Sequence, residues 1–143
     1  MAITSNGKYL FTAGGMYQKG FLKQWDLFKK ELKKDYGLIS KSEIYSIALA
    51  PDQDCLYTTG EEGRLLKILI EEERVIEDFV IEKLSDDSSD KIVNIGVTFD
   101  GQYLFVNNDN GCLRQISLLD FGKSVNTYEM MHDSVIEAIV ITN

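Results

Sequence analysis

Apolar and polar positions recur along this chain with a period of about 45 residues. In each period an Asn or Asp turn precedes an apolar stretch, and a glycine opens a second one, as residues 6–25, 52–68 and 100–116 show. Aligned in this way, the apolar positions form columns: Tyr9, Cys55 and Tyr103; Leu10, Leu56 and Leu104; Phe11, Tyr57 and Phe105. Self-similarity at this spacing predicts a repeat architecture, in which each period folds into the same structural unit.

Each period predicts four short β-strands. The first is nearly all apolar, as expected for a strand covered on both faces: 44–50, 92–99 and 135–141. The second is rich in aromatic and β-branched residues: 8–13, 54–59 and 102–107. The third follows a glycine: 21–26, 64–69 and 112–118. The fourth is more polar, as edge strands often are: 33–39, 75–82 and 124–130.

Two stretches also carry a helical signal. Residues 27–35 and 71–84 consist of good helix formers, and the apolar positions within 75–80 fit a helical stripe. The repeat register places both stretches in the hairpin between the third and fourth strands of a period. We therefore predict strand for both, and an all-β fold.

The motifs resemble those of the WD-repeat family of β-propellers. That family has an apolar inner strand, a Pro-Asp-Gly type turn, a second strand, and then a glycine and a strand that closes on Trp-Asp. Residues 44–52 (IYSIALAPD) and 20–26 (GFLKQWD) match this pattern, and His132 stands close to the place of the family's Gly-His. The Trp-Asp pair appears once, as Trp25-Asp26, so the repeats are degenerate.

The resemblance implies blades of four antiparallel strands in a single propeller segment, 1–143. The expected repeat boundaries lie near 6–51, 52–99 and 100–143, which gives about three blades. Propellers close with about four to eight blades, so this chain alone does not close a ring. Either it is part of a longer propeller, or two copies associate as half-propellers, with 135–141 of one copy supplying the inner strand that 1–4 barely supplies in the other.

Composition predicts an acidic, soluble, intracellular domain. The formal net charge of −8 argues against nucleic acid, and the lysines of 29–34 stand beside acidic residues, as in a solvated turn. No signal peptide is visible, and the apolar stretches are too short to cross a membrane. We expect a cytoplasmic protein, in a setting such as cytoskeletal or ciliary assembly. Its expected partners are proteins, some with basic surfaces, together with the remaining blades or a second copy.

The candidate chemistry gives no catalytic, metal or cofactor site. The acidic loop 85–90 (SDDSSD) lacks the glycine and the distal glutamate of an EF-hand loop, so a solvated linker is favoured. His132 is the single histidine, which excludes a multi-histidine zinc site within this chain. Cys55 and Cys112 lie in apolar strands without an adjacent base, and we predict buried free thiols.

The family resemblance implies that partners dock on the face formed by two sets of loops, those between blades and those between the second and third strands. Carried over to this chain, that face contains Tyr17, Lys19, Lys41, Glu43, Glu61, Glu62, Asp90, Asp109, Asn110, His132 and Asp133. Tyr17 is predicted to be an exposed aromatic residue in the long loop 14–19, the type that anchors interfaces. The implied function is a non-catalytic scaffold for protein–protein interaction in a larger assembly. The alternative is an enzyme-type propeller with a site at the channel mouth, where Ser46, Asn94 and Glu137 share one position of the inner strands.

Overall fold

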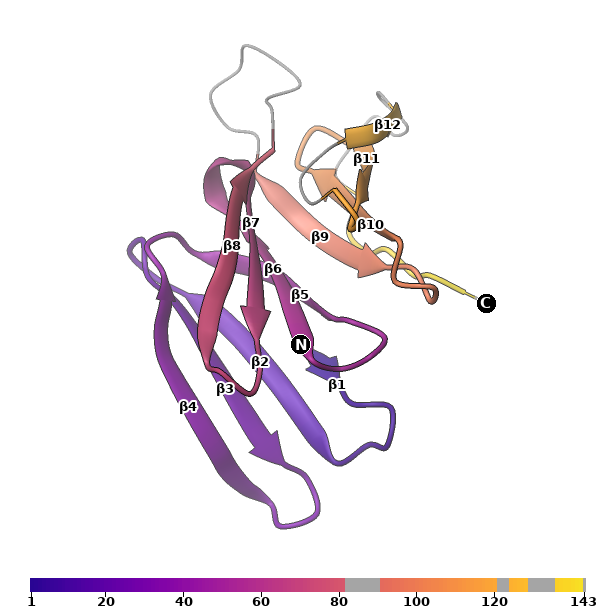
Figure 1. The fold of residues 1–143 in the computed structure, drawn as a ribbon. Helices are drawn as coiled ribbons and strands as arrows, with labels where there is room; N and C mark the ends of the chain where they lie inside the picture. The colour runs from indigo at the N-terminus through magenta and orange to yellow at the C-terminus, as the bar shows by residue number, and fades with distance from the viewer. Residues whose placement is uncertain (82–90, 121–123, 129–135, 143) are drawn as a thin grey trace.

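The computed structural model describes residues 1–81, 91–120, 124–128 and 136–142, with the backbone alone at 62, 124 and 125. The described chain forms three four-stranded antiparallel sheets, contains no α-helix and does not close a ring (Figure 1). We call the sheets blades 1 to 3 because their shape and order are propeller-like. The predicted all-β fold with about three blades is therefore confirmed.

Each blade takes its four strands in chain order. Blade 1 contains β1 (Ala2–Ile3), β2 (Tyr9–Gly15), β3 (Gly20–Asp26) and β4 (Glu31–Ser40). Blade 2 contains β5 (Ile44–Leu49), β6 (Cys55–Gly60), β7 (Arg64–Leu69) and β8 (Arg74–Val80), with the 3₁₀ helix η1 (Glu61–Gly63) between β6 and β7. Blade 3 contains β9 (Ile92–Val97), β10 (Tyr103–Asn108), β11 (Leu113–Ser117) and β12 (Ser124–Tyr128). As far as they are described, the helix-forming stretches thus lie in hairpins, as the repeat register predicted.

The turn between the first two strands has the same construction in all three blades. In blade 1, the Thr4 N–H donates to the Tyr9 carbonyl at 2.9 Å, and the Gly7 N–H donates to the Thr4 carbonyl at 2.8 Å. The same two bonds form from Ala50 and Gln53 in blade 2, and from Thr98 and Gly101 in blade 3. This turn needs a positive φ, which is 67° at Gly7 and Gly101 and 66° at Gln53. The sequence repeat is therefore also a structural repeat.

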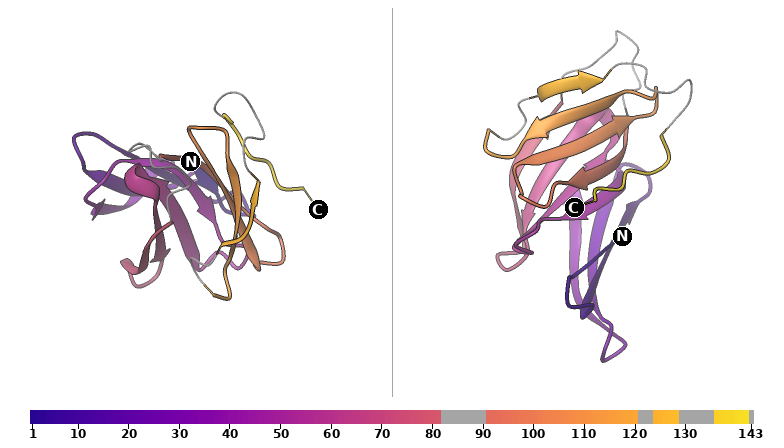
Figure 2. Two further views of the ribbon diagram at one scale, coloured as in Figure 1. Left: turned by 90° about the horizontal axis from the view of Figure 1, so that it is seen from above. Right: turned by 90° about the vertical axis from the view of Figure 1, so that its right-hand side faces the viewer.

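Alternate residues of a second strand face opposite sides of its blade. Phe11 points from blade 1 toward blade 2 and is buried in a cluster with Leu22, Ile44 and Leu56. Tyr57, in the same column as Phe11, points from blade 2 toward blade 3 and is buried in a second cluster that includes Leu104. The two apolar clusters therefore lie between the blades. The first strands lie innermost, where β5 contacts blade 1 and β9 contacts blade 2 (Figure 2).

Both cysteines are buried and free, as predicted. Cys55 belongs to the cluster between blades 2 and 3. Burial raises the pKa of its thiol above the ordinary value, which disfavours the reactive thiolate.

The predicted inner strand at 135–141 is wrong over the part that the structure describes. Residue 135 lies outside the described residues, and 136–142 belong to no sheet. The segment lies along blade 3, where the side-chain amides of Asn94 and Asn107 donate to the Ile136 carbonyl at 2.7 and 2.9 Å. Gly96 leaves room for Ile139, whose Cγ2 would lie 3.1 Å from an ideal Cβ at that glycine. The inner strands β5 and β9 each pair with a second strand of their own blade, and no such partner is described for 136–142.

Candidate functional site

The linker 41–43 between blades 1 and 2 and the turns between second and third strands gather at one end of the sheets (Figure 1). Three of the residues predicted for this face, Asp90, His132 and Asp133, lie outside the described residues. Glu62 is described by its backbone only. The other predicted residues divide into two regions, one on blade 1 and one at the junction of blades 2 and 3.

The junction region is centred on Tyr45. Its hydroxyl donates to Oε1 of Glu61 at 3.2 Å, and the Lys91 ammonium lies 5.8 Å from its ring centroid. Burial, followed by the charge of Glu61 and the smaller influences of Glu43 and Asp109, raises the pKa of Tyr45 to about 12. Three acids from three different loops therefore act on one tyrosine. We call Glu43, Tyr45, Glu61, Lys91 and Asp109 the Tyr45 cluster.

Two irregularities in the backbone produce this arrangement. The register of β5 on β6 passes from the pair Ile44–Gly60 to the pair Ser46–Thr59, so Tyr45 is the extra residue of a bulge. Bulges re-aim side chains, and Tyr45 is 38% exposed although the preceding Ile44 is buried. The second irregularity is the close approach of the linker between blades 1 and 2 to Gly60. An ideal Cβ at Gly60 would lie 1.9 Å from the Glu43 carbonyl oxygen, so only glycine leaves room for the linker.

The turn after β10 completes the Tyr45 cluster. The Asp109 N–H donates to the Lys91 carbonyl at 3.1 Å, which ties this turn to the residue before β9. Within the described residues, Oδ1 of Asp109 is shielded from solvent and has no hydrogen-bond partner. A buried carboxylate oxygen without a donor is unfavourable, so a donor supplied from outside would stabilise it. Asn110, in the same turn, is exposed.

The blade 1 region contains Tyr17 and Lys19, in the turn between β2 and β3. Tyr17 and Gln18 have φ values of 55° and 60°, and the Met16 N–H donates to the Lys19 carbonyl at 3.1 Å. Positive φ at both central residues is the geometry of a tight two-residue hairpin. Tyr17 is 84% exposed, as its sequence position indicated, and Lys19 and Lys41 are exposed as well.

Sequence reasoning missed Tyr45 and Lys91. Tyr45 lies in an apolar stretch that predicts a regular inner strand, and a bulge cannot be located from one sequence. The available signal was the column itself, in which Val93 and Ile136 occupy the positions equivalent to Tyr45. An aromatic hydroxyl among aliphatic equivalents indicates a side chain that requires a polar neighbour.

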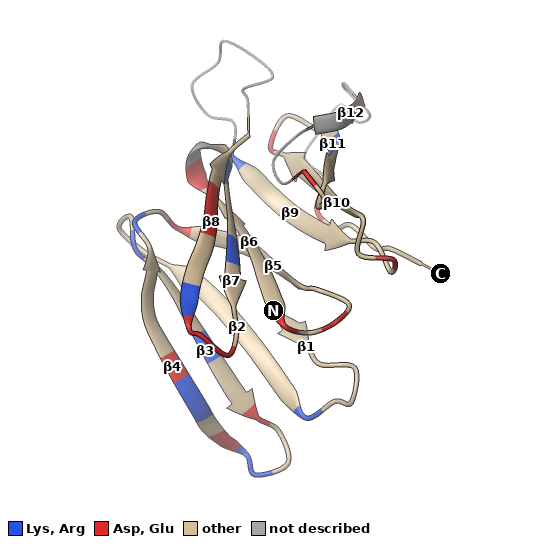
Figure 3. Cartoon of the chain, in the orientation of Figure 1, with Lys and Arg blue, Asp and Glu red and all other residues tan. Residues whose placement is uncertain are grey.

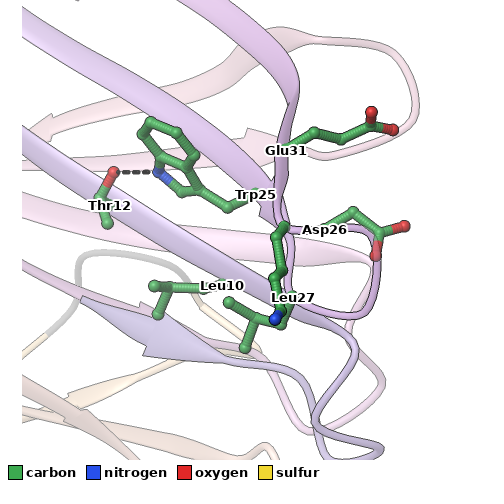
Figure 4. Close-up of a pocket in the computed structure, with 7 residues that line it drawn as sticks. Leu10, Thr12, Trp25, Asp26, Leu27 and Glu31 are labelled. Carbon is green, nitrogen blue, oxygen red and sulfur yellow. Dashed lines mark hydrogen bonds between the residues drawn. The ribbon is translucent and has the colours of Figure 1, made fainter.

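A pocket of about 350 Å³ lies on the face of blade 1 that is turned away from blade 2 (Figure 4). The Trp25 indole donates to Oγ1 of Thr12 at 2.9 Å in its wall. The Asp26 carboxylate accepts the N–H groups of Phe28 at 3.0 Å and Lys29 at 2.9 Å, which closes the turn after β3. These bonds lower the pKa of the Asp26 carboxyl group, and the bond from the Lys29 N–H has the largest effect. The pocket is lined by Leu10, Thr12, Trp25, Asp26, Leu27, Lys30 and Glu31.

The acidic loop 85–90, which was considered as a calcium site, lies outside the described residues. Within the described ranges, His, Cys, Asp and Glu nowhere form a group of three or more that could hold a metal ion. Of the three polar positions on the inner strands, Asn94 is engaged with the Ile136 carbonyl.

Comparison with known proteins gives no family assignment. No protein-family model matches the sequence, and no curated protein matches it. The architecture therefore rests on the three sheets and their repeated turn. None of the helices in the described ranges has the length and apolar character of a membrane span.

Proposed function

We propose that this chain is a segment of a WD-type propeller and acts as a non-catalytic scaffold that binds proteins through its loop face. The contacts that bring three loops to Tyr45 carry this proposal: its hydroxyl bonds to Glu61, the Glu43 carbonyl lies against Gly60, and the Asp109 N–H bonds to Lys91 beside the tyrosine ring. The partly exposed ring of Tyr45 can stack on a side chain of the partner, and the carboxylates attract Lys or Arg. The Trp25-Asp26 pair at the end of β3 and the turn shared by all three blades support the WD-type assignment.

The physical role of the blades is to hold these loops in fixed positions. Interblade clusters of buried residues fix the angle between neighbouring sheets, so the side chains of the loop face pay little ordering entropy on binding. The acidic loops steer a basic partner toward the face and increase its association rate. The expected partner is thus a protein segment rich in Lys or Arg.

A labelled peptide of alternating lysine and glycine tests this proposal by fluorescence anisotropy. The double variant Glu61→Gln with Asp109→Asn is expected to bind the peptide about tenfold more weakly, because two charge-assisted contacts are lost. The matched control, Glu71→Gln with Glu72→Gln, removes the same charge from the turn after β7 and is expected to change binding less than about twofold. Equal losses in both double variants would show that only the net charge matters.

The proposal also includes further blades beside blade 1, either from a longer chain or from a second copy. Cross-strand pairs align Ile3, Leu10, Trp25 and Leu32 on the outer face of blade 1. Leu38 lies on the same face and is 54% exposed. Leu56 and Leu104, which occupy the column of Leu10, each face the preceding blade. The outer face of blade 1 thus has the composition of a blade contact.

Sedimentation velocity tests whether that face can bind another blade. The 143-residue chain is expected to associate as its concentration rises, and Leu38→Lys is expected to weaken this association by placing a charge on the apolar face. Leu119→Lys, at a position that is 87% exposed, serves as the control and should leave association unchanged. A folded chain that stays monomeric at every concentration would contradict a blade-binding role for this face.

A further inference from the structure

Two lysines converge on one tyrosine at the end of blade 1 opposite the loop face. The Lys33 ammonium lies 4.0 Å from the ring centroid of Tyr9, and the Lys8 ammonium lies 4.9 Å from it. Lysines gather in this part of the molecule, on β4 and at the beginning of β2 (Figure 3). Eight of the fifteen basic residues of the chain fall within residues 1–41, so blade 1 is basic although the whole chain is acidic.

The strand register explains why these side chains meet. Lys8 immediately precedes β2, which begins at Tyr9. The Lys8 carbonyl accepts the Leu27 N–H at 2.9 Å, which brings the turn after β3 against this end. On β4, the pairing with β3 passes from Trp25–Leu32 to Gln24–Lys34. Lys33 is therefore the extra residue of a bulge, and its side chain is directed toward Tyr9 instead of a cross-strand partner.

Ion pairs within the described residues do not balance the charges of these two ammonium groups. Two neighbouring lysines are paired, Lys29 with Glu31 at 3.8 Å and Lys34 with Glu73. Neither Lys8 nor Lys33 forms an ion pair in the described part of the chain. The carboxylate of Asp26 acts on Lys8, but it is held by two backbone N–H groups of its own turn. Hydrogen bonding to Lys8 and then to Lys33 lowers the pKa of the Tyr9 hydroxyl, as expected beside an excess of positive charge.

We propose that Lys8, Lys33 and the Tyr9 hydroxyl bind the phosphate of a phosphoserine or phosphothreonine in a partner protein. The site offers two cationic donors and one hydroxyl donor, and a phosphate of nearly two negative charges balances both ammonium groups, whereas a carboxylate balances one. Nucleic acid is disfavoured, because blades 2 and 3 carry the excess of acidic residues and would repel a long polyanion. Phe28, which is 72% exposed in the turn tied to Lys8, offers an apolar contact for the flanking peptide.

This site is independent of the loop face, since β2 runs from Tyr9 at one end of the blade to Gly15 at the other. A segment that binds at the phosphate site therefore leaves the Tyr45 cluster free. The scaffold would then recognise a partner by two features, a basic segment at one end and a phosphorylated segment at the other.

Fluorescence anisotropy tests this site on the whole chain. The probes are a short labelled peptide that carries one phosphothreonine and its unphosphorylated twin. The phosphopeptide is expected to bind at least about tenfold more tightly than its twin. The double variant Lys8→Gln with Lys33→Gln is expected to lose about tenfold, and Tyr9→Phe, which keeps the ring, about threefold. The control, Lys29→Gln with Lys30→Gln, removes the same charge from the adjacent turn and should change affinity less than about twofold.

Circular dichroism of each variant establishes that it is folded before binding is compared. Equal binding of the two peptides, or equal losses in both lysine double variants, would overturn the proposal in favour of diffuse electrostatic attraction. A second arm measures binding to vesicles that contain phosphatidylserine. Vesicle binding that depends on Lys8 and Lys33, without competition by the phosphopeptide, would also overturn it, because the site would then recognise a membrane surface.

Discussion

Phe11→Ala is expected to lower the free energy of unfolding by about 4 kcal/mol. The Phe11 side chain is 1% exposed and packs in the cluster between blades 1 and 2, which includes Leu22 and Leu56. Truncation removes buried apolar surface and leaves a cavity between the two sheets. The sheets cannot easily move together to fill it, because each is held by its own hydrogen bonds. Urea denaturation followed by circular dichroism measures the change.

Phe28→Ala is the matched control for this prediction. Phe28 is 72% exposed in the turn after β3, so its loss is expected to change the unfolding free energy by less than about 0.5 kcal/mol. Similar costs for the two substitutions would contradict the packing of blade 1 against blade 2.

Gly60→Ala is expected to destabilise the chain by about 3 kcal/mol, near the upper range for overpacking. Its Cβ would lie 1.9 Å from the Glu43 carbonyl oxygen, which is backbone and cannot turn aside as a side chain would. The linker between blades 1 and 2 must therefore shift, which should open the neighbouring Tyr45 to solvent and reduce the burial that is the largest cause of its raised pKa. The pKa of Tyr45, about 12, should then fall toward its ordinary value, so that the tyrosine ionises at lower pH in an alkaline absorbance titration. Tyr45→Phe identifies which part of that titration belongs to Tyr45.

Gly14→Ala is the control for the glycine substitution. Gly14 also lies near the end of a second strand, but its ideal Cβ meets no atom within 4 Å. Alanine there is expected to be neutral or to stabilise the chain by about 0.5 kcal/mol, because it restricts the unfolded state. A similar loss of stability at Gly14 and Gly60 would show that strand propensity, and not the contact with Glu43, sets the cost.

The blades could be predicted from the sequence because the repeat register contains long-range information. Residues 27–35 and 71–84 contain good helix formers, and local propensity alone would assign helices there. The register placed both in hairpins, and the structure has β4 and β8 at those positions. Cross-strand pairing with β3 and β7 outweighs the intrinsic preference of single residues.

The features that sequence reasoning missed depend on details of pairing. The bulges at Tyr45 and Lys33 each arise from one unpaired residue in a strand whose composition is ordinary. The apolar pattern of 135–141 predicted an inner strand, but a strand also needs a partner that offers its backbone groups, and none is described for 136–141. The exposure of Tyr17 could be predicted from its place in a turn, and its role as an anchor of an interface stays a prediction.

Equivalent residues of the repeat do not contribute equally to holding the chain together. Leu56 is fully buried against blade 1, whereas Leu10, in the same column, only lines an open pocket. Blade 2 has buried residues on both faces, such as Ile68 toward blade 1 and Leu65 toward blade 3, so opening it separates both interblade clusters. Amide hydrogens of β6 and β7 should therefore exchange with solvent only in openings that approach global unfolding, while those of the outer strands exchange through smaller ones.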